Sequence, residues 1–253
     1  MAKKYYVVWK GRQHGIYTTW EQCKQQVDGF TGAKFKSYPS LAEAEAAFGA
    51  QPAPVRRTAA TTKPPTKAKS AALTQAQIEA MPFDIKIFSD GGCEPNPGKA
   101  GTGLAVYEHN QLSELWFGLF QTYGTNNTAE LHGLHHALLM AQDKLSLGQS
   151  VAIFCDSKYS IDCITQWAPG WEKKGWKKSG GEIKNLEIIQ PAYRLYQALA
   201  SRITIHHVNG HVDIEGNELA DRMSIVAIDT QETDLIRYRQ PYNIPEIMAL
   251  RTG

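Results

Sequence analysis

The sequence predicts an α/β fold built on a mixed β-sheet, preceded by a small α+β unit with a three-stranded antiparallel sheet. From residue 84 onward, three strand-like segments occur in hairpin order, and helix-like and strand-like segments then alternate. This order is typical of a mixed sheet with helices on its faces. A stretch rich in Pro, Ala, Thr and Lys separates this part from the first unit, and 253 residues suit one large domain or two unequal ones. We therefore predict a first domain at residues 1–49, a linker at 50–82, a main domain at 83–228 and a tail of unknown role at 229–253.

The first unit begins with two strands, because aromatic and β-branched residues dominate residues 5–9 and 16–18 on either side of a glycine-containing turn. Thr19 has the spacing of an N-cap, which predicts a helix directly after it. A short third strand at residues 35–38 and a helix at residues 40–48 complete the unit.

The main unit is predicted from the periodicity of its apolar residues. The helix predicted at residues 128–144 carries Leu131, Leu134 and Leu138 on one side. We expect strands at residues 84–89, 101–109, 112–123, 151–156 and 203–208, and further helices at 157–167, 181–200 and 216–228. Residues 73–82 favour a short helix, whereas residues 229–253 show no clear pattern.

The net charge of +2 hides an asymmetry between the two ends of the chain. Residues 1–83 hold 12 Lys and Arg against 5 Asp and Glu, whereas residues 84–253 hold 15 against 20. A basic front part suggests an arm that binds a polyanion. The four cysteines show no C-x-x-C spacing, and no apolar run approaches the ~18 residues of a membrane span. We expect a cytoplasmic protein with reduced thiols and no membrane contact.

Four carboxylates carry the strongest functional signal: Asp90, Glu130, Asp156 and Asp221. Asp90 and Asp156 follow apolar, strand-like runs, and the other two lie on predicted helices. Ligand sites of α/β sheets gather at the carboxyl ends of strands, so these acids can face one cleft. There they would repel one another unless divalent cations were bound. Four acids can hold two Mg²⁺ ions about 3.5–4 Å apart, an arrangement that suits in-line hydrolysis of a phosphodiester.

His211 is a further candidate, because it follows a glycine in a loop after a predicted strand. A loop imidazole beside a metal pair could move protons or assist product release. The alternative is a surface or capping histidine.

The order of five short segments resembles type 1 ribonuclease H. These segments are residues 90–93 with 96–98, 125–131, 156–157, 210–211 and 216–221. The resemblance implies a five-stranded mixed sheet with helices on both faces. It also implies an endoribonuclease that hydrolyses the RNA strand of RNA–DNA hybrids, leaving 5′-phosphate and 3′-hydroxyl ends.

The resemblance also implies a role for each acid. Asp90 would bridge two Mg²⁺ ions, for which Mn²⁺ could substitute, and Asp221 would help to hold the ion that activates water. Glu130 and Asp156 would help to hold the ion beside the leaving group, with His211 as the mobile loop histidine.

Further positions are implied to contact nucleic acid. Asn126, Asn127 and the backbone at Gly91 would face the RNA strand, whose 2′-hydroxyls distinguish it from DNA; the alternative for the asparagines is helix capping. A segment of tryptophans and lysines fits phosphate neutralisation and stacking. In this segment, residues 167–178, we expect Trp167 in the core and Trp171 at the surface. The resemblance implies that the DNA strand is bound by Trp176, Lys173, Lys174, Lys177 and Lys178.

Residues 4–48 resemble the hybrid-binding domain attached to some ribonucleases H. The resemblance implies that Trp20 and Phe35 contact DNA sugars, with Tyr6 and Lys36 near the backbone; the alternative is that the aromatics form the small core. Ser37 stands where family members often carry a second lysine, which could weaken phosphate contact. A flexible linker would keep the catalytic domain near a bound hybrid.

Two other functions remain open at this point. One is another nuclease of the same fold, acting on duplex or branched DNA, and the other is a non-catalytic hybrid-binding protein. The four acids favour the enzyme. We expect a monomer whose partner is an RNA–DNA hybrid.

Overall fold

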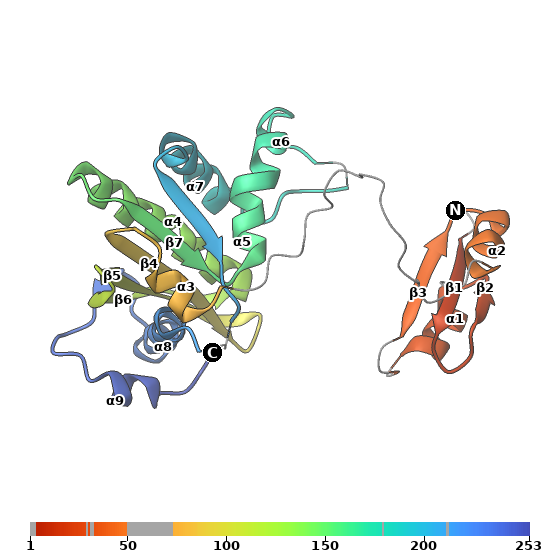
Figure 1. Cartoon of the computed structure of the whole chain (residues 1–253), viewed down its shortest axis with the longest axis horizontal. Helices are drawn as coiled ribbons and strands as arrows, with labels where there is room; N and C mark the ends of the chain where they lie inside the picture. Colours follow the sequence, from red (N-terminus) through yellow and green to blue (C-terminus); the bar gives the residue numbers. More distant parts are fainter. Residues whose placement is uncertain (1–3, 29, 31–32, 50–72, 179, 211–212) are drawn as a thin grey trace, which may run out of the picture. The chain divides into compact units, whose positions relative to one another are not determined.

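The computed structural model describes residues 4–28, 30, 33–49, 73–178, 180–210 and 213–253. The chain divides into two compact units, Met1–Thr66 and Lys67–Gly253, and Figure 1 shows the elements of both. In its described part, the first unit has a three-stranded antiparallel sheet in the order β2-β1-β3. Its elements are β1 (Tyr5–Lys10), β2 (Gly15–Tyr17), α1 (Trp20–Val27), β3 (Lys34–Tyr38) and α2 (Leu41–Gly49). The fold predicted for this unit is confirmed, and Thr19 caps α1 as expected.

The second unit contains the mixed sheet, with the strand order β8-β7-β4-β5-β6-β9. Its strands are β4 (Ile85–Glu94), β5 (Gly98–Glu108), β6 (Gln111–Gly124), β7 (Val151–Cys155), β8 (Ile203–His207) and β9 (Ile236–Arg237). The first three pair antiparallel, and β7 and β8 continue the sheet in parallel. The five predicted strands are confirmed, and the tail adds β9 as a sixth, at the edge beyond β6.

Helices cover both faces of this sheet (Figure 1). They are α3 (Gln75–Glu79), α4 (Asn126–Ser146), α5 (Lys158–Asp162), a π-helical segment η1 (Cys163–Trp167), α6 (Ala168–Glu172), α7 (Leu186–Leu199), α8 (Glu215–Thr230) and α9 (Ile244–Met248). Side chains of α4 and α7 form one core with the sheet, and side chains of α3, α8 and α9 form the other. The helix expected at 181–200 begins only at Leu186. Among the described residues, no helix is long and apolar enough to cross a lipid bilayer.

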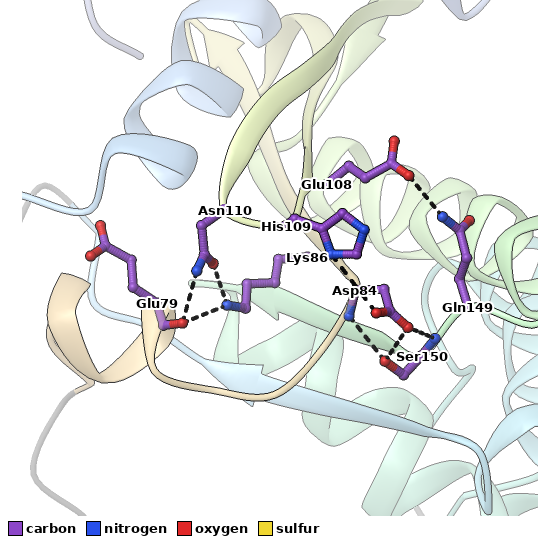
Figure 2. Close-up of polar contacts among 8 residues, drawn as sticks. All are labelled: Glu79, Asp84, Lys86, Glu108, His109, Asn110, Gln149 and Ser150. Atoms are coloured by element: carbon purple, nitrogen blue, oxygen red, sulfur yellow. Dashed lines mark hydrogen bonds and ion pairs between the residues drawn. The ribbon is translucent and has the colours of Figure 1, made fainter.

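The helix α3 belongs to the second unit and packs into its core, although residues 50–82 were predicted as a linker. Of that range, 50–72 lie outside the described residues, but Ile78 is buried in the core. Figure 2 shows the polar side of this attachment. The buried Lys86 donates through Nζ to the carbonyl oxygen of Glu79 at 3.0 Å and to Oδ1 of Asn110. Asn110 Nδ2 also donates to Glu79 O, at 3.0 Å. The main unit therefore includes α3, which joins the start of β4 to the β5–β6 turn.

Candidate active site

Strand register brings Asp90 and Asp156 next to each other. The parallel ladder between β4 and β7 ends with Ser89 opposite Cys155. The next residue along the chain from each of these is one of the two acids, so both lie at the same level along the two strands. Asp156 thus occupies the strand end predicted for it, whereas Asp90 lies inside a strand that continues to Glu94.

Glu130 reaches the site because α4 touches β4 without a side chain between them. A Cβ atom on Gly91 would lie 2.3 Å from the backbone nitrogen of Glu130 and 2.4 Å from the carbonyl carbon of Ala129. Only glycine leaves room for this contact. From β5, the hydroxyl of Thr102 donates to Ala129 O at 2.9 Å, which fixes the same turn of α4.

Asp221 is brought in by a second contact of this kind, on the opposite face of the sheet. A Cβ atom on Gly103 would lie 2.1 Å from the carbonyl oxygen of Ala220 in α8. Gly103 is the register partner of Asp90 across β4 and β5. Paired residues point to the same face of a sheet, so Asp90 points toward the helix that carries Asp221.

The charges of the four acids act on one another. Asp90 is 8% exposed. Burial raises its pKa well above the usual range, and the negative charges of Asp156, Asp221 and Glu130 raise it further. Burial also raises the pKa of Glu130, as does the charge of Asp156, against a hydrogen bond from Ser157 that lowers it. The other three acids are therefore close enough to disfavour ionisation of Asp90, and Asp156 is close enough to disfavour that of Glu130.

Each acid also accepts hydrogen bonds from the protein. Gly91 N–H donates to Asp90 Oδ1 at 2.7 Å, and the Ser157 hydroxyl donates to Glu130 Oε2. Asn217 Nδ2 donates to Asp156 Oδ2 at 3.3 Å. In the parts of the chain that the structure describes, no three His, Cys, Asp or Glu side chains are arranged as a ready metal-binding site.

Asp221 is held on both of its oxygens. Oδ2 is ion-paired with Arg222, and Oδ1 accepts from Gly253 N–H at 3.1 Å. We did not predict Arg222 as part of the site, because an arginine next to an aspartate carries no spacing signal. The tail contact was also missed, since residues 229–253 have no periodicity.

His211 lies outside the described residues, so its predicted role remains a prediction. The loop that leads to it does begin at the site. Val208 N–H donates to Cys155 O at 3.1 Å. A Cβ atom on Gly210 would lie 2.8 Å from Asp156 Oδ2.

The asparagines at the start of α4 do not cap it. Thr125 is the N-cap, and its side chain accepts from Thr128 N–H at 3.1 Å. The Thr128 hydroxyl in turn accepts from Thr125 N–H, which completes a capping box. Asn126 and Asn127 occupy the first turn with exposed side chains, and they are available for other contacts.

The burial predicted for Trp167 and the full exposure predicted for Trp171 were wrong, whereas the DNA contact of Trp176 stays a prediction. Trp167 is 40% exposed, whereas Trp171 and Trp176 are half-buried against the core of α4 and α7. The π-helical segment η1 explains why Trp167 is exposed. A π-helix has more residues per turn than an α-helix, so the side chains that follow point in other directions than expected. Cys163 and Ile164 of η1 are the residues that fill the core.

The lysines of this segment are exposed, as expected: Lys173, Lys174, Lys177 and Lys178. A pocket of about 400 Å³ lies beside them, lined among others by Asn127, Trp167, Trp171, Lys178 and Asn185.

In the first unit, two of the predicted aromatic residues lie at the surface. Trp20 is 43% and Phe35 is 42% exposed, with ring centroids 5.8 Å apart. Tyr6 packs partly on the small core, and its ring centroid lies 5.7 Å from that of Trp20. The alternative that these aromatics form the core is therefore wrong for Trp20 and Phe35, and Tyr6 contributes to the core in part. Lys36 is exposed next to Phe35 on β3.

Comparison with known proteins agrees with both units. Residues 82–228 match the family model described as RNase H, and residues 4–48 match the one described as Ribonuclease H1 N-terminal domain. Ribonuclease H of Acidovorax sp. is 37% identical over 141 residues, which are 55% of this chain and 91% of that protein. Ribonuclease H1 of Mus musculus is 28% identical over 254 residues, covering 87% of each chain.

A solved structure supports the fold. The crystal structure of LC9-RNase H1, described as a type 1 RNase H with the type 2 active-site motif, superposes with a TM-score of 0.52 at 23% identity. The match covers 67% of this chain and 83% of that one.

Proposed function

The chain belongs to the RNase H family and is a ribonuclease H, and from this premise we propose how its site works. The proposed reaction is endonucleolytic hydrolysis of the RNA strand of an RNA–DNA hybrid. Two divalent cations, Mg²⁺ or Mn²⁺, would be held by Asp90, Glu130, Asp156 and Asp221. The observation that carries this proposal is the placement of the acids: Asp90 and Asp156 directly follow the last paired residues of the β4–β7 ladder, and the close contacts at Gly91 and Gly103 bring in the helices that carry Glu130 and Asp221.

The donor set fits hard divalent cations. All four groups are carboxylates, which are the ligands that Mg²⁺ prefers. They come from β4, α4, the end of β7 and α8, and their mutual repulsion calls for positive charge. When bound, the cations supply activation of water and neutralisation of charge on the leaving oxygen.

The expected products follow from an in-line displacement at phosphorus. A water oxygen forms a new bond to phosphorus while the bond from phosphorus to the 3′ oxygen breaks. The 3′ oxygen leaves with a proton as a hydroxyl group, and the phosphate remains on the 5′ side of the next nucleotide. A group on the loop after β8, for which we propose His211, would move the proton.

The residues around the site would select the hybrid. Asn126 and Asn127 present exposed amides at the start of α4, where they can contact 2′-hydroxyls of the RNA strand. The four exposed lysines and Trp176 are proposed for the DNA strand, with Trp176 acting from a half-buried position. Gly91 has a further reason to be glycine, because the backbone of α4 fills the place of its side chain.

The first unit would bind the hybrid separately from the catalytic step. Trp20 and Phe35 present a pair of exposed rings, a platform on which sugars or bases can stack. Tyr6 would contact the nucleic-acid backbone beside that platform, and Lys36, which points to the other face of β3, would contact it from there. The monomeric state and the cytoplasmic location stay predictions.

A labelled hybrid tests the proposal. The chain should cut its RNA strand with Mg²⁺ and not with EDTA, and end-group analysis should find 5′-phosphate and 3′-hydroxyl. Asp90→Asn should abolish cleavage while hybrid binding persists, because phosphate contacts remain. An active Asp90→Asn chain, or preferential cutting of duplex or branched DNA, would overturn the assignment.

A further inference from the structure

The tail after α8 packs along the second unit, although it lies beyond the region that matches the RNase H family. The strand β9 pairs with β6, so that Phe117 faces Ile236. The Tyr242 hydroxyl accepts from Leu115 N–H at 3.2 Å, and Ile247 of α9 is 2% exposed in the core. These contacts fix the path of the tail across β6 and α8.

The end of this tail reaches the active site. Arg251 binds Glu94 at the end of β4 and Asp229 near the end of α8. Two residues later, Gly253 N–H donates to Asp221 Oδ1 at 3.1 Å. A proposed metal ligand is therefore in contact with a segment that the family match does not include.

Arg222 joins the tail to the same carboxylate. Its side chain is ion-paired with Asp221 Oδ2, and its Nε donates to the carbonyl oxygen of Met248 at 3.4 Å. Asp221 is 6% and Arg222 is 7% exposed. In this arrangement both carboxylate oxygens of Asp221 are engaged, one by a buried positive charge and one by the backbone of the tail.

From these contacts we infer that Arg222 and the segment from Met248 to Gly253 form a positioning element that holds the Asp221 carboxylate and sets how tightly the site binds divalent cations. This inference rests on the proposed function, in which Asp221 is a metal ligand. A buried carboxylate needs a counter-charge, and Arg222 provides one without a cation. A cation that binds Asp221 must share or displace these partners, so weakening them should tighten cation binding.

The full chain and variants at Arg222, Gly253 and Arg237 test the inference. Mg²⁺ binding is measured by isothermal titration calorimetry without nucleic acid, and melting temperature is measured in EDTA and in MgCl₂. Arg222→Gln removes the competing charge and should bind Mg²⁺ roughly tenfold more tightly. Its melting temperature should fall in EDTA and rise more in MgCl₂ than that of the parent. Arg222→Lys keeps the charge and should stay closer to the parent.

Gly253→Pro removes the N–H group that donates to Asp221, but it also places a Cβ atom 2.7 Å from Asp221 Oδ1. Gly253→Ala adds the same atom and keeps the N–H, so it is the reference for this variant. Gly253→Pro should bind Mg²⁺ roughly two- to tenfold more tightly than Gly253→Ala. If Arg222→Gln does not fold, the Mg²⁺ affinity of Gly253→Pro alone tests the positioning role. Arg237→Gln is the matched control, since it removes a tail hydrogen bond to Ser113 O at the β9 end and should leave Mg²⁺ affinity unchanged.

The outcomes separate this inference from the function on which it rests. Unchanged or weaker Mg²⁺ binding both in Arg222→Gln relative to the parent and in Gly253→Pro relative to Gly253→Ala would overturn the positioning role, even if the parent binds Mg²⁺ and cleaves hybrid. Tightening in Arg237→Gln as well would also overturn it, because the effect would then be a general loosening of the tail. A parent chain that binds no divalent cation would instead refute the proposed function.

Discussion

Replacing Gly91 with alanine tests whether direct contact between β4 and α4 places Glu130. The added Cβ atom would start 2.3 Å from Glu130 N and 2.4 Å from Ala129 C, whereas ordinary contact begins at 3.4 Å. Both obstructing atoms belong to the backbone, so no side chain can turn away. The strand and the helix must separate by on the order of 1 Å, and a misplacement of that size costs about 10²-fold in rate. Overpacking should also cost about 1–3 kcal/mol of unfolding free energy.

The assay is kcat on a labelled hybrid with saturating Mg²⁺, together with urea unfolding and a hybrid-binding measurement. Binding should persist, because the first unit is untouched. The matched control is Gly170→Ala on α6, where nothing lies within 4 Å of the added atom. It should keep the parental kcat and gain slightly in stability. A Gly91→Ala chain with kcat within about threefold of the parent would show that this contact does not place Glu130.

Three further predictions concern other parts of the chain. Ser157→Ala removes the donor that orients Glu130 through Oε2. Both oxygens of Asp221 are engaged by competing partners, whereas this change costs orientation of a ligand, so it should lower metal affinity or kcat about 10–100-fold; Ser146→Ala, at the far end of α4, is the control, and equal kinetics for the two would contradict the prediction. Burial and the neighbouring His135 and His132 lower the pKa of His136 from 6.5 to about 4. The unfolded chain therefore binds more protons between these pH values, and stability is lost as pH falls from about 6.5 to 4, by about 1–2 kcal/mol after allowance for solvent screening. His136→Gln should flatten this slope in pH-dependent urea unfolding, and an unaltered slope would count against it. Deleting residues 1–50 should make cleavage of a long hybrid distributive at limiting enzyme, and unchanged product lengths would argue that the first unit adds no processivity.

The fold was largely predictable because its strands carry the usual signals. Alternating and continuous apolar runs mark β4 and β7, and they end where the ladder between them ends. The tail was not predictable, since β9 has only two residues and its position depends on pairing with β6. Local periodicity cannot report such a contact, whose partner lies more than 100 residues earlier in the chain.

The site was predictable at the level of residue identity and less so at the level of contacts. The acids could be found from their positions after strands and on helices. The capping role of Thr125 was also present in the sequence, because Thr128 stands three residues later, but capping was considered as the alternative role of the neighbouring asparagines, which are stronger cap formers. The tryptophans were misplaced because a π-helical turn changes the spacing on which helical phase depends.

The distribution of partners among the acids indicates which of them depends most on a cation. Glu130 accepts from a hydroxyl group, and Asp221 has a buried guanidinium. In the part of the chain that the structure describes, Asp90 receives the N–H of Gly91 and takes part in no ion pair, although it is buried. Its pKa is raised well above the usual range, by burial first and then by its acidic neighbours. A cation relieves both causes at once. Of the three acids compared, Asp90 is therefore the one whose charged form gains most from metal binding, which agrees with the bridging position that the resemblance to type 1 ribonuclease H implies.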